Sequence, residues 1–81
     1  MNERIQPLNR MGPGQSARVV RLEVAGELRR RLLDLGLIEG TRVRCLHRAP
    51  CGDPAAYDIR GAVIALRDRD SAGILAAPLP R

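Results

Sequence analysis

The strongest structural signal in the sequence is a stretch near the middle of the chain, Arg31-Leu32-Leu33-Asp34-Leu35-Gly36-Leu37-Ile38-Glu39-Gly40. Leucines recur with helical spacing at Leu28, Leu32 and Leu35, so they share one face of a helix and form an apolar stripe. Leu33 lies off that stripe. The pattern predicts one amphipathic helix of about ten residues.

The end of this helix is marked by Gly36. A glycine just past the last periodic residue can adopt the left-handed conformation that closes a helix. If Gly36 does so, Leu37 lies where the closing motif places an apolar contact with Leu32. The sequence therefore predicts a helix from Gly26 that stops at Gly36 with its own hydrophobic contact.

Short segments typical of strands flank the helix on both sides. We expect strands over residues 17–24, 41–48, 55–60, 62–66 and 73–77, with one helical turn over 68–72. The second and third strands should pair as a hairpin, and residues 62–66 should be buried on both faces. About five short strands with one helix after the first predict a mainly β fold, a small barrel that closes on itself to hide its edges.

Length and composition limit the chain to one small domain. It has 81 residues and a mass of 8.9 kDa, which excludes a two-domain enzyme. We expect a single domain over residues 1–81 with a core over about 7–77, a loose lead-in over residues 1–9 and a loose C-terminal tail.

The charge balance favours an acidic partner. Fourteen basic residues, all arginine, outweigh nine acidic ones and give a net charge of +5. Tyr57 is the only aromatic residue, which argues against a single-stranded nucleic-acid module because those modules stack bases on several rings. No apolar run approaches the roughly 20 residues of a membrane span, and no secretory signal is visible. We therefore expect a cytoplasmic protein whose Cys45 and Cys51 are reduced thiols.

Three motifs occur in order along the chain. The first is the stretch at 31–40, close to R-L-x-x-L-G-L-x-P-G; the second is Gly52-Asp53-Pro54; the third is Ile64-Ala65-Leu66-Arg67, followed by Ala72 and Ile74. Together they resemble the FeoA family over about residues 7–77. Glu39 departs from the family's usual proline. The structural motif residues of the resemblance are Leu32, Gly36, Leu37, Gly40, Gly52, Asp53 and Pro54.

The resemblance implies a small SH3-like β-barrel that acts with FeoB, the membrane Fe(II) transporter with a cytoplasmic GTPase domain. The chain would be an accessory or regulatory protein with no catalysis and no cofactor of its own, recruited to the inner membrane by FeoB, with weak self-association left open. Related domains also occur in iron-dependent repressors. A nucleic-acid-binding or metal-responsive regulatory module is therefore the alternative, although we expect no stable nucleic-acid complex.

Two groups of residues are candidates for partner binding. Leu33 is flanked by Arg29 and Arg30 and is either covered by the N-terminal segment or exposed for a partner. The strand over 41–48 carries a second basic group, Arg42, Arg44 and Arg48. Charge runs of this kind also occur as ordinary solvated surface.

Metal binding and catalysis have weaker support. Thiol, imidazole and carboxylate groups gather at Cys45, His47, Cys51 and Asp53, and alternation would place Cys45 and His47 on one strand face. Their spacing matches no established ligand pattern, so we assign no metal and expect Cys45 to be buried. With one histidine, no lysine and no phosphate-binding loop, the chain offers no catalytic set.

Overall fold

The structure, a computed structural model, describes residues 4–80. Its first element is a short strand that the sequence pattern did not predict. In chain order, the elements are β1 (Gln6–Pro7), the 3-10 helix η1 (Leu8–Arg10), β2 (Ser16–Leu22), α1 (Gly26–Asp34), β3 (Arg42–Arg48), β4 (Ala55–Ile59), β5 (Ala62–Leu66), α2 (Asp68–Ser71) and β6 (Ile74–Pro78). The mainly β class is confirmed, with the long helix after the second strand instead of the first. Among the described residues, no helix is long and apolar enough to cross a membrane.

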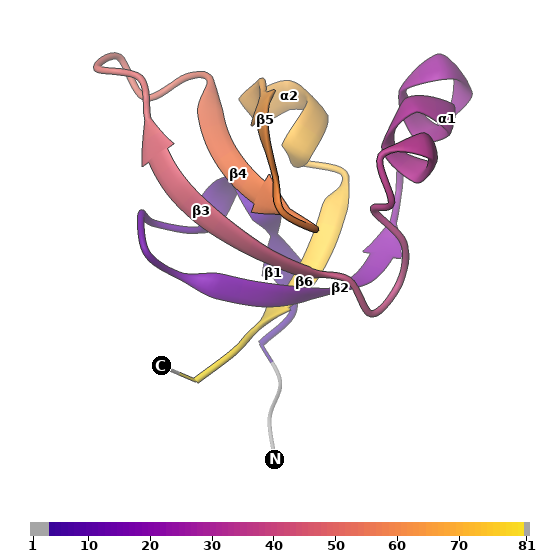
Figure 1. The fold of residues 1–81 in the computed structure, drawn as a ribbon, viewed down its shortest axis with the longest axis horizontal. Coiled ribbons are helices and arrows are strands. Elements are labelled where there is room, and N and C mark those ends of the chain that lie inside the picture. The colour runs from indigo at the N-terminus through magenta and orange to yellow at the C-terminus, as the bar shows by residue number, and fades with distance from the viewer. Residues whose placement is uncertain (1–3, 81) are drawn as a thin grey trace.

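All six strands belong to one antiparallel sheet in the order β1-β6-β2-β3-β4-β5. Figure 1 shows this sheet bending around a common interior while α1 projects to one side. No pairing joins β1 to β5 within residues 4–80, so the barrel is open and the expectation that closure hides both edges is wrong. The reason is β1, which has only two residues and offers too little backbone to pair with a second strand.

The interior is filled mainly by aliphatic side chains around a single aromatic ring, that of Tyr57. Val43 and Cys45 of β3 face Ile59 and Tyr57 of β4 across the hairpin, and all four are fully buried. Further core residues are Leu8, Met11, Ala17, Val19, Leu32, Leu37, Ala55, Leu66, Ile74 and Ala76. The predicted pairing of these two strands and the predicted burial of Cys45 are both confirmed.

The end of α1 has the geometry that its sequence predicts. Gly36 has φ +92°, its N–H bonds to the carbonyl of Leu33 at 2.9 Å, and the N–H of Leu37 bonds to the carbonyl of Leu32 at 2.9 Å. These two bonds define a Schellman motif. Leu32 and Leu37 are both fully buried, so the helix stop and its hydrophobic contact are confirmed.

The regular alternation of β3 ends at a β-bulge. Cys45 pairs with Tyr57, yet His47 pairs with Ala56, so Leu46 is an extra residue in the ladder. The extra residue reverses which way the following side chains point. His47 is exposed and Arg48 is half-buried, so the expectation that Cys45 and His47 share one face is wrong.

The N-terminal segment is part of the fold. Gln6 and Pro7 pair with β6, and Leu8 is fully buried beneath the sheet. The expectation of a loose lead-in is therefore wrong over residues 6–9, because one apolar side chain in a polar segment was enough to anchor it; residues 1–3 lie outside the described part. At the other end, the N–H of Leu79 bonds to the carbonyl of Ser16 at 2.9 Å, so the tail is held up to that point.

Strand β5 is an edge strand, not a strand buried on both faces. Val63 is 68% exposed, which corrects the interpretation of this apolar run as an interior strand. β5 is joined to β4 by a two-residue turn in which Arg60 and Gly61 both have positive φ, 54° and 88°. Such turns match the right-handed twist of paired strands. β5 lies at one end of the sheet, and because it carries no charged residue, this edge of the sheet is uncharged.

Candidate partner-binding surface

The first candidate surface is the Leu33 patch, which we define as Leu33, Arg29 and Arg30 on α1. Leu33 is 38% exposed and lies beside a shallow hollow of about 300 Å³ that both arginines line. Of the two alternatives for this leucine, exposure is therefore the correct one. The helix that carries it projects to one side of the sheet (Figure 1), and the exposed side chain of Leu33 lies on that helix.

The helix that carries the Leu33 patch is joined to the barrel through its inner side. On the inner side of α1, Leu32 is fully buried and Leu28 packs against the core. Arg29 donates a hydrogen bond from Nη1 to the carbonyl of Leu22 at 3.4 Å, which ties the helix to the end of β2. Ile38, four residues after the end of the helix, is also exposed, at 49%. The patch combines an exposed aliphatic side chain with two guanidinium groups on one helix.

The second candidate surface is the outer basic face, which we define as Arg18, Arg42, Arg44 and Arg60. Arg18 on β2 lies directly across from Arg42 on β3, and all four side chains are exposed. Arg42 and Arg44 line two adjacent hollows of about 320 Å³ each, one reaching Ser16 and the C-terminal tail and the other reaching Arg60. The sequence predicted Arg42 and Arg44 for this face and missed Arg18 and Arg60.

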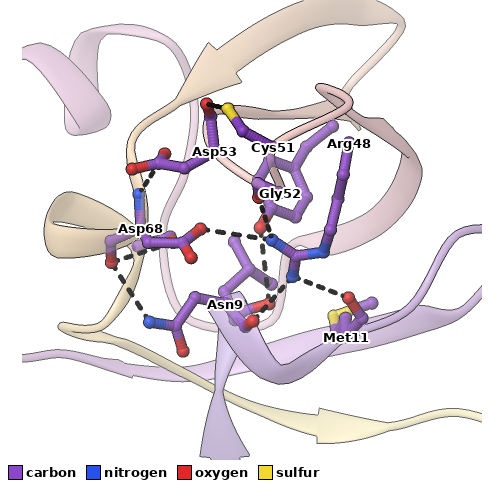
Figure 2. A network of polar contacts seen from close by, with 10 residues as sticks. Asn9, Met11, Arg48, Cys51, Gly52, Asp53 and Asp68 are labelled. Atoms are coloured by element: carbon purple, nitrogen blue, oxygen red, sulfur yellow. Dashed lines mark hydrogen bonds and ion pairs between the residues drawn. The ribbon is translucent and has the colours of Figure 1, made fainter.

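Arg48 does not belong to the outer basic face, although the sequence grouped it there. The bulge at Leu46 turns its side chain to the other side of β3, where it is 22% exposed. Its Nη2 donates to the carbonyls of Asn9 at 2.6 Å and Met11 at 2.9 Å. Its Nη1 donates to the carbonyl of Gly52 and to Oδ1 of Asp68, both at 3.2 Å. Figure 2 shows this guanidinium at the centre of what we call the Arg48 network.

The Arg48 network joins segments that are far apart in the chain. The N–H of Asp68 bonds to Oδ1 of Asp53 at 3.0 Å, and Nδ2 of Asn9 bonds to the carbonyl of Asp68 at 3.2 Å. The hydroxyl of Tyr57 donates to the carbonyl of Leu8 at 3.4 Å. Together with the contacts of Arg48, these bonds fix η1, the turn before β4 and the start of α2 against one another (Figure 2). Arg48 thus contacts all three of these segments.

The remaining motif residues shape turns. Gly40 donates its N–H to the carbonyl of Val19 at 2.8 Å, and Gly52 donates to the carbonyl of Ala49 at 2.7 Å. The peptide between Asp53 and Pro54 is cis, and the carbonyl of Pro54 accepts the N–H of Ala49 at 2.9 Å. The bond of Gly40 joins the turn before β3 to β2, whereas the bonds of Gly52 and Pro54 close the loop between β3 and β4, from which Gly52 and Asp53 reach the Arg48 network.

The four residues considered for a metal are not brought together. Cys45 is in the core, His47 is exposed on β3, and Cys51 is exposed in the turn with its Sγ 3.1 Å from the carbonyl of Asp53. Within residues 4–80, no three histidine, cysteine or acidic side chains lie close enough to hold a metal ion. Burial raises the pKa of the Cys45 thiol, with a smaller opposing effect from Arg48, which keeps the thiol protonated and a poor ligand.

Sequence and structural comparisons identify relatives of this fold. The family model for the FeoA domain matches residues 6–78. The Fe(2+) transport protein A/Fe(2+) transporter FeoB fusion protein of Porphyromonas gingivalis is 34% identical over 67 residues, which cover 83% of this chain and 8% of that protein. The chain thus corresponds to a small part of that relative's length.

Two solved structures are similar to the whole fold. The solution structure of FeoA from Chlorobium tepidum has a TM-score of 0.88 and 32% identity, covering 93% of this chain and 71% of that one. FeoA of Stenotrophomonas maltophilia complexed with zinc, described as a procaryotic SH3 domain protein, has a TM-score of 0.78 and 24% identity over 88% of each chain. The second likeness confirms the SH3-like fold alone. With a family model that matches from β1 to β6, this chain belongs to the FeoA family.

Proposed function

We propose that the chain is a non-catalytic accessory protein of ferrous iron uptake that binds the cytoplasmic side of a FeoB-type Fe(II) transporter and modulates its activity. Membership of the FeoA family, which is involved in ferrous iron transport, supports the pathway. The Porphyromonas gingivalis relative supports the partner, since its name joins transport protein A and the transporter in one chain. Covalent linkage raises the effective concentration of two parts that work in contact.

The observation that carries the docking proposal is the exposed Leu33 on a projecting helix. Binding energy in protein interfaces concentrates in a few apolar and arginine anchors. The Leu33 patch supplies one apolar side chain between two arginines. We infer that it is the docking element and that the arginines mainly speed association, because exposed charges act more on the rate of encounter than on affinity.

The test is a binding titration of the chain against the purified transporter in detergent. Leu33→Asp should fold normally, since the side chain is exposed, and should weaken binding at least tenfold by burying an unpaired charge in the interface. The matched control is Val63→Asp, which introduces the same charge at an exposed apolar residue of β5. The control should bind like the wild type.

Three results contradict the docking proposal. Unfolding of Leu33→Asp would place Leu33 in the core; normal folding with normal binding would exclude α1 as the docking element. Equal weakening by both variants would show that added negative charge, and not the site, is responsible. In the second case the outer basic face becomes the next surface to test.

A further inference from the structure

The outer basic face concentrates positive charge on adjacent strands in register. Ser16 of β2 lies across from Arg44 of β3, which lies across from Asp58 of β4. The neighbouring row pairs Arg18 with Arg42. Asp58 is thus the one acidic side chain that the pairing places among these arginines, and it also accepts the N–H of Gly61 at 3.0 Å. The face keeps a strong positive excess.

Among the residues that the structure describes, no arginine of this face forms an ion pair with a carboxylate. Within residues 4–80, the ion pairs are Arg21 with Glu23 and Arg48 with Asp68, and neither includes a member of the face. Arg18 donates from Nη1 to the carbonyl of Gly40 at 2.9 Å, which orients it without neutralising it. Uncompensated like charges repel one another. An anion bound from outside would relieve that repulsion.

The spacing of Arg42 and Arg44 suits phosphate groups. Residues two apart on a strand point to the same side and are separated by roughly 7 Å, so a phosphodiester can lie between their guanidinium groups. Arginine binds phosphate through two parallel hydrogen bonds. The hollows on either side of this pair, each of about 320 Å³, leave room for further headgroups. The face can therefore contact several phosphates at once.

From this geometry we propose that the outer basic face binds the phosphate headgroups of an anionic membrane surface. A nucleic acid is the less suitable polyanion, because Tyr57, the only aromatic side chain, is fully buried and cannot stack on a base. The choice of a membrane over other anions rests on the proposed function, which brings the chain to a transporter. The outer basic face and the Leu33 patch share no residue, so the two proposals assign transporter and lipid to different side chains.

The experiment is sedimentation of the full chain with vesicles of phosphatidylcholine, prepared with and without phosphatidylglycerol. Each basic side chain near an anionic surface strengthens binding by about fivefold. Arg42→Gln/Arg44→Gln should therefore weaken binding to the anionic vesicles by about 25-fold. The matched control is Arg67→Gln/Arg69→Gln, which removes the same charge from exposed residues elsewhere and should change binding by less than about threefold. Thermal melting of both variants checks that they fold.

The outcomes separate the ligands and leave the transporter proposal untouched, because the vesicles contain no transporter. Binding to anionic vesicles alone, lost mainly in Arg42→Gln/Arg44→Gln and weakened by salt, supports the proposal. Equal loss in the control double variant, or no vesicle binding by the wild type, overturns it. So does tighter binding to a single-stranded RNA oligonucleotide at the same ionic strength, or displacement from vesicles by inorganic phosphate with salt held constant.

Discussion

The two halves of β3 carry the same residue type in opposite roles. Before the bulge at Leu46, Arg42 and Arg44 are exposed and form no ion pair among the described residues. After it, Arg48 turns inward and donates to three backbone carbonyls and one carboxylate. One additional residue in the ladder therefore decides whether an arginine of this strand is part of the structure or part of the surface.

The largest effect is expected from truncating one arginine of each half of β3. Arg48→Ala should lower the free energy of unfolding by about 2 to 4 kcal/mol, because half-buried carbonyls lose a charged donor that nothing else replaces. Arg44→Ala, the matched control on the exposed half, should change it by less than about 0.5 kcal/mol. Urea denaturation of the two variants measures both values. A similar loss of unfolding free energy in both variants would contradict the different roles of the arginines before and after the bulge.

A second, smaller effect is expected where the outer basic face meets the end of α1. A Cβ at Gly36 would lie 2.5 Å from Cδ of Arg60, and the backbone there has φ +92°. Gly36→Val should therefore destabilise the domain by more than about 1 kcal/mol, chiefly through left-handed strain at a β-branched residue. Because Arg60 is flexible, Arg60→Ala should not rescue the variant. An unchanged melting temperature for Gly36→Val would contradict the helix-stop geometry.

A third prediction concerns the stability of the protein at alkaline pH, which depends on two buried groups of the β3–β4 hairpin, Cys45 and Tyr57. Burial raises the pKa of Cys45 above its ordinary 9.0 and that of Tyr57 above its ordinary 10.0. For Tyr57, the side chain of Ser71 opposes this effect of burial. Both groups ionise more readily in the unfolded chain, so their contribution to stability is complete below pH 9 and falls as pH rises through the folded-state pKa values.

Denaturation at increasing pH measures this loss. Cys45→Ala should show a shallower fall in unfolding free energy above pH 9 than the wild type, because only Tyr57 remains to ionise. Cys51→Ala is the matched control, since Cys51 is exposed, and its pH profile should follow the wild type. Identical profiles for all three proteins would show that the Cys45 thiol ionises equally in both states.

Much of the fold could be predicted because its signals are local. The helix stop depends on Gly36 and two leucines within six positions, and the hairpin of β3 and β4 follows from a dense turn between alternating strands. Both were correct for that reason. The short β1 strand was missed because two residues are too few to show the alternation of a strand. Its position also depends on Leu8, which enters a core formed by the rest of the chain.

The candidate site could be predicted only in part. Leu33 was identified because its place off the helical stripe is a local feature, but its exposure depended on what the N-terminal segment covers. Arg18 and Arg60 were missed because only strand pairing brings them beside Arg42. Arg48 was misplaced because no residue type marks the bulge; Leu46 fits a regular strand as well as a bulged one.

Amide hydrogen exchange of the chain with and without the purified transporter tests directly whether α1 is the docking element. If the Leu33 patch is the docking surface, binding should slow exchange over residues 26–38 and leave β3 and β4 unchanged, since detergent-solubilised transporter presents no extended lipid surface to the outer basic face. Leu33→Asp should abolish that protection. Protection confined to β3 and β4, or protection of residues 26–38 that persists in Leu33→Asp, would contradict the assignment of α1 as the element through which this FeoA-family protein acts.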